Sequence, residues 1–137
     1  MDILIRLIHN SAVHSATEIG TGTVFGYGGI ALVIHTKSKI GSNCIIGSNV
    51  TIGGKSGSTE VPVIGDNVYI ATGAKILGNV KVGSNSVIGA NAVVVKDVPE
   101  NSVVAGVPAK IIAKDINPRD YYLSLIHISE PTRRTTI

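Results

Sequence analysis

The sequence of 137 residues contains no tryptophan, one phenylalanine and one cysteine. That cysteine, Cys44, excludes an internal disulfide and fits a reducing compartment, so we expect a cytoplasmic protein. No apolar run approaches the roughly 18 residues of a membrane span. The apolar start, residues 1–8, is interrupted by Asp2 and Arg6 and is unlike a secretory signal peptide. Lysine and arginine are scattered rather than clustered, which argues against a nucleic-acid partner.

Glycine and branched aliphatic residues take the place of the missing aromatics. The chain contains 16 glycines, and its hydrophobic residues, 44% of the total, are rich in isoleucine and valine. An ordinary globular core of this size uses more large aromatic side chains. A core of isoleucine and valine with many glycines is typical of repetitive β-structure.

An aliphatic residue recurs at every sixth position over most of the chain. The members of this frame are Ile34, Ile40, Ile46, Ile52, Ile64, Ile70, Ile76, Val82, Ile88 and Val94. Asparagine or glycine often stands third after the aliphatic residue, and both tolerate left-handed backbone angles. Such a unit predicts a flat side and a corner, and three units make one triangular coil. Successive coils then stack at a strand spacing of about 4.8 Å, with the aliphatic residue and the small fourth residue pointing inward.

Two interruptions break the frame. The first lies within residues 53–60, where Ser58 takes an aliphatic position and the frame resumes a whole number of units later, which predicts a protruding loop. The second lies between Ile19 and Ile34, whose spacing is not a multiple of six. We expect its extra residues in the glycine-rich segment 25–29. Interruptions of a regular stack are common places for functional loops.

Two motifs carry a resemblance to a known family. Residues 63–83 read VIGDNVYIATGAKILGNVKVG, and the repeat ends at residues 105–112 with AGVPAKII. Both resemble the hexapeptide-repeat acyltransferases, and within them the C-terminal catalytic domain of the serine O-acetyltransferases. The tripeptide Gly106-Val107-Pro108 favours this branch over the sugar acetyltransferases, which more often read Gly-Asn-Pro there. The resemblance covers about residues 14–112.

The resemblance implies an all-β fold, a left-handed parallel β-helix, and a homotrimer with sites between subunits. It also implies acetyl-CoA as co-substrate, bound in a groove between neighbouring prisms. An acetyl group moves from the thioester to an acceptor hydroxyl, with a histidine as general base and backbone amides stabilising the oxyanion. L-serine is the expected acceptor, which gives O-acetylserine for cysteine biosynthesis. Because His35 is the only histidine in the regular body, a three-histidine zinc site is not supported and no metal is expected.

Three positions depart from the pattern of that family. Tyr27 stands where the serine enzymes carry the catalytic histidine, and Glu60-Val61 stands where they carry an Arg-His pair. A glutamate that helps to bind serine aligns with His35. These departures leave open a sugar or polysaccharide precursor as acceptor. A non-catalytic trimeric scaffold is the third interpretation.

His35 is the predicted catalytic residue, because a neutral imidazole can take a hydroxyl proton near about pH 7. The alternative is an exposed histidine at a coil corner. Tyr27 and Glu60 are the predicted substrate-binding residues. The alternatives for Tyr27 are loop packing and a catalytic role, and those for Glu60 are orientation of His35 and a solvated charge. His14 is interpreted as structural.

The predicted contacts with acetyl-CoA lie in the protruding loop, on two adjacent coils and after the final motif. Small residues let an extended ligand lie close to backbone amides, and a lysine suits a CoA phosphate. Repeat geometry and solvated charge are the alternatives. The set is Gly53, Gly54, Lys55, Gly73, Ala74, Gly89, Ala90 and Lys110.

The chain divides into four segments on this interpretation. Residues 1–12 form a lead-in, a remnant of a helical domain in one interpretation, and residues 13–112 form the β-helix. Residues 113–123 form a C-terminal arm, as a short helix or an extended segment. Residues 124–137 do not fit the family and are expected to be a non-native, disordered tail.

Overall fold

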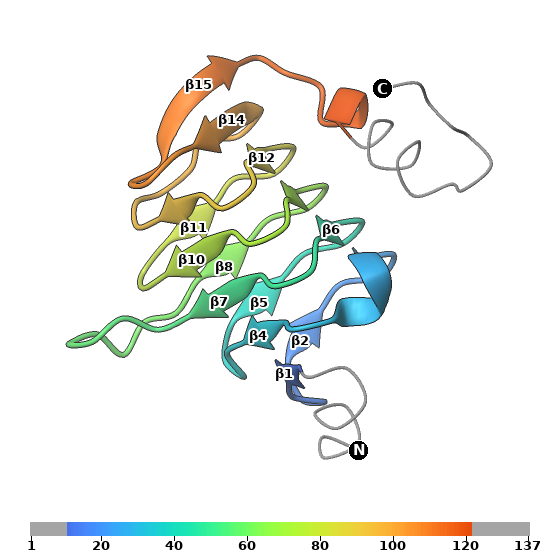
Figure 1. Ribbon diagram of the computed structural model, residues 1–137, viewed down its shortest axis with the longest axis vertical. Helices are drawn as coiled ribbons and strands as arrows, with labels where there is room; N and C mark the ends of the chain where they lie inside the picture. Colours follow the sequence, from blue (N-terminus) through green and yellow to red (C-terminus); the bar gives the residue numbers. More distant parts are fainter. Residues whose placement is uncertain (1–10, 122–137) are drawn as a thin grey trace.

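The computed structural model describes residues 11–121, while residues 1–10 and 122–137 lie outside the described part (Figure 1). The predicted tail at 124–137 and most of the predicted lead-in therefore fall outside it. Among residues 11–121, no helix has the length and apolar character needed to cross a membrane.

Short strands of two to five residues, joined by turns and loops, recur along the described chain. In chain order the elements are β1 (Ala12–Val13), β2 (Glu18–Ile19), β3 (Val24–Phe25), the 3₁₀ element η1 (Gly26–Gly29), β4 (Val33–Ile34), β5 (Lys39–Ile40), β6 (Ile45–Ile46), β7 (Thr51–Gly53), β8 (Val63–Ile64), β9 (Tyr69–Ile70), β10 (Lys75–Leu77), β11 (Lys81–Val82), β12 (Val87–Ile88), β13 (Val93–Val94), β14 (Ser102–Ala105) and β15 (Lys110–Lys114). After β15 the chain enters a helical turn at residues 119–121.

The strands form three sheets, one on each side of a triangular prism. Sheet 1 has the order β1-β4-β7-β10-β13, sheet 2 has β2-β5-β8-β11, and sheet 3 has β3-β6-β9-β12-β14-β15. Each coil passes through sheets 1, 2 and 3 in turn, and Figure 1 shows the coils stacked from β1 to β15 along the long axis. The fold is a left-handed parallel β-helix, which confirms the predicted fold class.

The six-residue frame fills the interior of the prism. In the regular coils, Val33 pairs with Thr51, and Tyr69 pairs with Val87, each exactly three units of the frame further along the chain, as a three-sided coil requires. Every aliphatic residue of the frame from Ile34 to Val94 is only 0–4% exposed. The small fourth-place residues, Cys44 among them, are buried beside them, and burial raises the pKa of the Cys44 thiol above its ordinary value. The predicted inward positions are therefore confirmed.

Asparagines turn the corners of the coils with left-handed backbone. Their φ angles lie between 54° and 60° at Asn43, Asn49, Asn67, Asn85 and Asn91. This conformation costs an ordinary L-residue about 1–2 kcal/mol, and asparagine adopts it more readily because its short polar side chain can hydrogen-bond locally. The glycines that follow the aliphatic residue meet a different requirement. A Cβ atom on Gly41 would lie 2.4 Å from the carbonyl oxygen of Gly65, so the stacked corners leave no room for a side chain.

We expect the substitution Asn85→Ala to lower the free energy of unfolding by about 1 kcal/mol, because alanine resists the φ of 60° at this corner. Asn85→Gly should cost less than half of that amount, since glycine enters the left-handed region freely. Urea unfolding followed by circular dichroism measures both. The control is Asn79→Ala, an exposed asparagine outside the left-handed set. An equal loss for Asn85→Gly and Asn85→Ala would contradict the backbone explanation.

Both predicted interruptions are confirmed at the predicted places. Val24 pairs with Ile45, which lies half a six-residue unit further along the chain than its partner in a regular coil would lie. The additional residues lie in and around η1. Lys39 pairs with Val63, which lies one whole unit beyond the regular partner, so the additional unit leaves the stack as a loop over residues 54–62. Figure 1 shows this loop projecting from the body between β7 and β8.

The end of the stack differs from the regular coils. Val87 pairs with Val103, which comes before the partner that three full units would give, so the last coil is shorter than the others. The chain then reverses, and β15 pairs antiparallel with β14 around a bulge and a turn that contains the cis Val107–Pro108 peptide bond. The sequence did not predict this hairpin, because its residues do not follow the six-residue frame. A closing element of this kind covers the last parallel strand of sheet 3, which would otherwise present unpaired backbone groups.

Candidate functional site

His35 follows β4 directly, in the turn where the chain passes from sheet 1 to sheet 2. Three hydrogen bonds fix this turn. The His35 amide donates to the carbonyl of Ile52 on the next coil at 2.8 Å, and the Ser38 amide donates to the His35 carbonyl at 3.0 Å. The Lys37 amide donates to Nδ1 of the His35 ring at 3.0 Å. The side chain itself is exposed, so its outer ring atoms are open to a ligand.

His14 occupies the same position one coil earlier. Val13 of β1 is the strand partner of Ile34 in β4, so the residues that follow them stack in register. The Ala16 amide donates to Nδ1 of His14 at 3.0 Å, which repeats the turn of His35. The sequence analysis did not note this repetition, and its interpretation of His14 as structural stays a prediction. The signal was present in the sequence, as an aliphatic residue followed by histidine at Val13-His14 and again at Ile34-His35.

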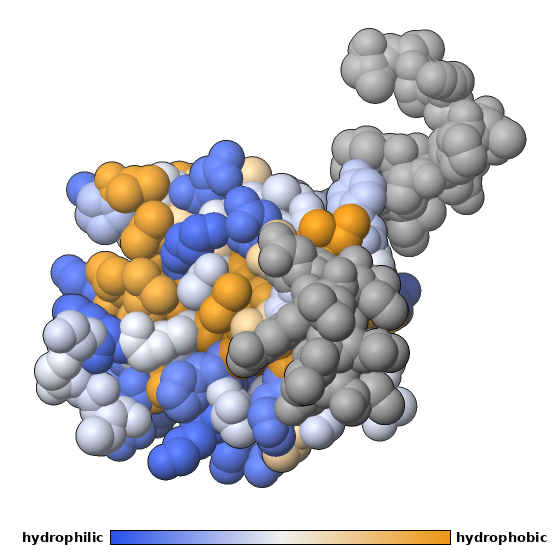
Figure 2. Space-filling model, turned by 60° about the horizontal axis from the view of Figure 1, so that its bottom comes forward, coloured by the Kyte–Doolittle hydropathy of each residue, from blue (hydrophilic) through white to orange (hydrophobic). Residues whose placement is uncertain are grey.

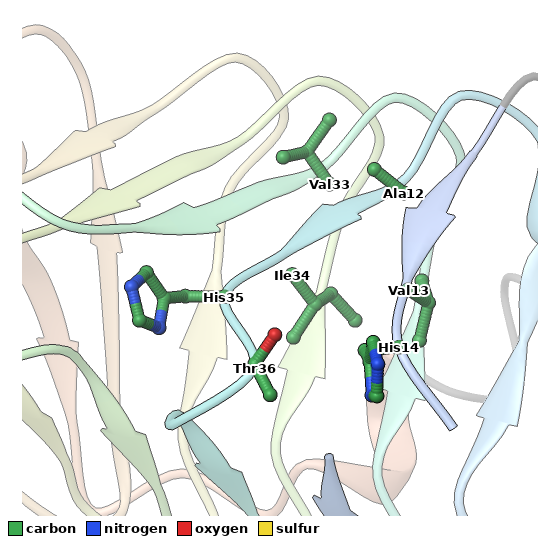
Figure 3. A pocket seen from close by; sticks show the side chains of 7 residues that line it. All are labelled: Ala12, Val13, His14, Val33, Ile34, His35 and Thr36. Atoms are coloured by element: carbon green, nitrogen blue, oxygen red, sulfur yellow. The ribbon is translucent and has the colours of Figure 1, made fainter. Parts of the chain in front are cut away.

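A pocket of about 220 Å³ lies along β1 and β4 (Figure 3). Figure 3 shows the two histidine rings on either side of it, with Ile34 and Thr36 between them. Its lining is Ala12, Val13, His14, Val33, Ile34, His35 and Thr36. Most of these side chains are apolar, so the pocket offers an apolar surface with two imidazoles and one hydroxyl.

The protruding loop stands on the same edge of the prism as His35. Gly53 follows Ile52, the strand partner of Ile34, and therefore lies one coil beyond His35. Its carbonyl accepts a hydrogen bond from the Gly78 amide at 2.9 Å, which anchors the base of the loop to the next coil. Lys55 packs against Gly78, where a Cβ atom would lie 3.1 Å from the Lys55 Cβ. Gly53, Gly54 and Lys55 thus extend the edge that His35 begins.

Glu60 lies further along this loop and is exposed. The loop is organised by its own turn, in which the Ser58 amide donates to the Lys55 carbonyl at 3.1 Å. The Glu60 amide donates to the Ser58 hydroxyl at 3.1 Å. Within the described residues no ion pair joins Glu60 to His35, so its predicted contact with substrate stays a prediction.

Tyr27 lies on a different edge, where each coil passes from sheet 3 to sheet 1. It belongs to η1, has left-handed backbone angles (φ 52°, ψ 34°), and is 57% exposed. A left-handed tyrosine is uncommon and costs about 1–2 kcal/mol. Burial raises the pKa of Tyr69, and the charge of Tyr27 raises it further.

Four of the predicted cofactor contacts follow Tyr27 along this second edge. Gly73 and Ala74 lie between β9 and β10, and both are buried. Gly89 and Ala90 lie after β12 on the next coil, and Ala90 is exposed. Only the exposed part of this edge can meet a ligand without rearrangement. The predicted cofactor role of these residues stays a prediction.

Lys110 begins β15 and is the strand partner of Ala105, which packs on Gly89 of the second edge. It is exposed and lines a pocket of about 250 Å³ at the end of the stack, together with Val94, Lys96, Asp97, Val98, Val104, Ala109 and Ile111. Two lysines therefore border an apolar hollow there. The carboxylate of Asp97 borders the same hollow, and the predicted contact of Lys110 with a CoA phosphate stays a prediction.

One chain does not bring all the predicted residues together. His35, Gly53, Gly54, Lys55 and Glu60 share the edge between sheets 1 and 2. The edge between sheets 3 and 1 carries the second set, which is Tyr27, Gly73, Ala74, Gly89 and Ala90. Sheet 1 separates the two edges. Within residues 11–121, no group of three or more histidine, cysteine, aspartate or glutamate side chains gathers as metal ligands would.

Known proteins resemble this chain in both sequence and fold. A model of the family described as bacterial transferase hexapeptide (six repeats) matches residues 62–96. A serine acetyltransferase of Staphylococcus aureus (strain Mu50) is 44% identical over 112 residues, which cover 80% of this chain and 52% of the relative. A serine acetyltransferase of Synechococcus elongatus is 35% identical over 123 residues, 86% of this chain and 50% of the relative. The chain thus spans about half the length of these relatives.

Solved structures give the same picture. Serine acetyltransferase from Brucella abortus in complex with coenzyme A has a TM-score of 0.77 at 38% identity, covering 82% of this chain and 45% of that one. The serine acetyltransferase of Neisseria gonorrhoeae has a TM-score of 0.78 at 35% identity, covering 89% of this chain and 48% of that one. Another solved serine acetyltransferase holds cysteine.

Proposed function

We propose that this chain, which belongs to the hexapeptide-repeat transferases and is similar to serine acetyltransferases, transfers an acetyl group from acetyl-CoA to the hydroxyl of L-serine. The product is O-acetylserine, a precursor in cysteine biosynthesis. The observation that carries the proposal is the likeness to serine acetyltransferases, which covers 80% of this chain in sequence and 82% in structure. A cytoplasmic location is part of the proposal and is supported by the single, buried cysteine.

We propose His35 as the residue of this chain that acts on the reactants. It is exposed, it borders the pocket, and it stands beside the base of the protruding loop. Acetyl-CoA supplies the activated acetyl group, and the loop residues Gly53 to Lys55 support its extended arm through backbone amides. A base role for His35 requires an unprotonated Nε2 that faces the acceptor hydroxyl. In this turn Nδ1 accepts a hydrogen bond from the Lys37 amide. A base role for Nε2 therefore requires the ring to break that hydrogen bond.

We propose that the protein is a homotrimer with its active sites between subunits. The division of the predicted residues between two edges of the prism supports this arrangement, because neighbouring prisms can bring unlike edges together. Apolar side chains are exposed around the second edge, with Val24 at 53%, Ile30 at 50% and Val33 at 45%. Figure 2 shows hydrophobic residues grouped on the face that it presents, which suits burial against another subunit.

The proposed activity is tested by thiol release from acetyl-CoA with the purified chain. We expect free CoA well above the hydrolysis background with L-serine, and mass spectrometry should identify O-acetylserine. A panel of sugars is the competing acceptor set, motivated by the exposed Tyr27 in place of a histidine. Faster transfer to a sugar would replace serine as the acceptor. No release with any acceptor would indicate the non-catalytic scaffold.

A further inference from the structure

The ring of His35 is held in one tautomer by its own turn. An amide N–H can only donate, and the Lys37 amide donates to Nδ1 at 3.0 Å. Nδ1 therefore presents its lone pair to the backbone and carries no proton. A neutral imidazole has one ring proton, so that proton lies on Nε2. The outer nitrogen of His35 is then a hydrogen-bond donor.

The backbone around this ring is fixed on both sides. The His35 amide donates a hydrogen bond to the Ile52 carbonyl of the next coil, and the His35 carbonyl accepts one from the Ser38 amide. Figure 3 shows the ring projecting away from Ile34 and Thr36. Turning the ring to expose Nδ1 would leave the Lys37 amide without its ring acceptor. The turn thus favours the Nε2–H form in the resting protein.

We propose that His35 serves acetyl transfer as a hydrogen-bond donor through Nε2–H, and that it does not take the proton of the acceptor hydroxyl. The proposal rests on the function proposed above. Its ligand is an anionic oxygen of the reactants. Two groups of the reactants carry such an oxygen. One is the thioester oxygen as it becomes an oxyanion, and the other is the carboxylate of an amino-acid acceptor.

The transfer balances without a proton on His35. The acceptor oxygen forms a bond to the acetyl carbon, the carbon–sulfur bond breaks, and the thiolate of CoA leaves. The hydroxyl proton ends on that sulfur by way of solvent water. A donor aimed at the oxyanion contributes about 10²–10³-fold to the rate in well-studied acyl transfers.

The tautomer is tested directly by nitrogen NMR of the ¹⁵N-labelled full chain at neutral pH. We expect Nδ1 of His35 in the unprotonated chemical-shift range and Nε2 in the protonated range. The signal is assigned by its loss in the His35→Gln variant. A proton found on Nδ1 in the neutral ring would overturn the proposal, whatever the activity of the protein.

The role in transfer is tested with three replacements at one position. The side-chain amide nitrogen of glutamine reaches the place of Nε2 and can only donate a hydrogen bond. The asparagine side chain is one carbon shorter, so its amide nitrogen does not reach that place. We expect His35→Gln to keep activity within about 10-fold of the unaltered protein, and His35→Ala and His35→Asn to lose about 10²–10³-fold. Equal, severe losses in all three variants would mean that His35 is a base. Thermal unfolding of each variant provides the check on folding.

Comparison of L-serine with L-serinamide, which lacks the carboxylate, distinguishes the two sources of the oxygen. If the partner is the thioester oxygen, His35→Ala lowers kcat for both acceptors. If the partner is the carboxylate, His35→Ala raises KM for L-serine and leaves L-serinamide unchanged. If the unaltered protein shows no acetyl transfer, the proposed function and the inference are both refuted. An active protein with an inactive His35→Gln variant would refute the inference alone.

Discussion

Replacement of Ile64 by alanine is expected to lower the free energy of unfolding by about 3 kcal/mol, a large part of the stability of a small domain. Ile64 is 2% exposed and pairs through β8 with Ile40 on one side and Val82 on the other. The lost methyl groups leave a cavity that the rigid stack cannot close, because each coil is hydrogen-bonded to the coils before and after it. Urea or thermal unfolding at fixed protein concentration measures the change.

The preceding residue provides a matched control on the same strand. Val63 points outward from β8 and is 41% exposed, so Val63→Ala removes far less buried surface. We expect a loss below about 1 kcal/mol. Similar losses at both positions would show that the inner and outer faces of the strand do not differ as the frame requires. Comparison of the two variants therefore tests the register of the stack, in addition to the packing.

The sequence predicted the regular coils because one short-range rule governs them. An inward aliphatic residue such as Ile70 and a left-handed corner such as Asn67 recur every six residues, and each coil stacks on an almost identical one. The places of η1 and of the protruding loop also followed from breaks in that frame. The hairpin of β14 and β15 did not, because it ends the stack once and has no repeat to reveal it.

The candidate site was less predictable, because it depends on orientation rather than spacing. The sequence placed His35 beside an interruption, and the structure puts it next to the loop base at Gly53. Nothing in the spacing shows that the Lys37 amide occupies Nδ1 of the ring. The separation of Tyr27 from His35 is equally hidden, since three-sided coils place residues of nearby sequence on different edges.

Mixed trimers of two impaired variants are expected to recover activity if the site is shared between subunits. Tyr27→Ala removes a side chain from one edge and His35→Ala removes one from the other, so each homotrimer has every site damaged. In any mixed trimer, one junction joins an intact Tyr27 edge to an intact His35 edge. Trimers purified through a different tag on each variant should therefore show about one third of the unaltered activity. That is a gain of about 10²-fold over the His35→Ala homotrimer.

The control is a trimer of two differently tagged His35→Ala chains, which has no intact His35 edge and should stay inactive. Sedimentation analysis verifies that both preparations are trimers. If mixed trimers show no recovery, Tyr27 and His35 do not meet across a subunit boundary. In that case the pocket of one chain, between β1 and β4, must hold the acceptor by itself. Recovery near one third would instead explain why a single prism keeps its predicted residues on two edges, because the neighbouring subunit supplies the missing edge.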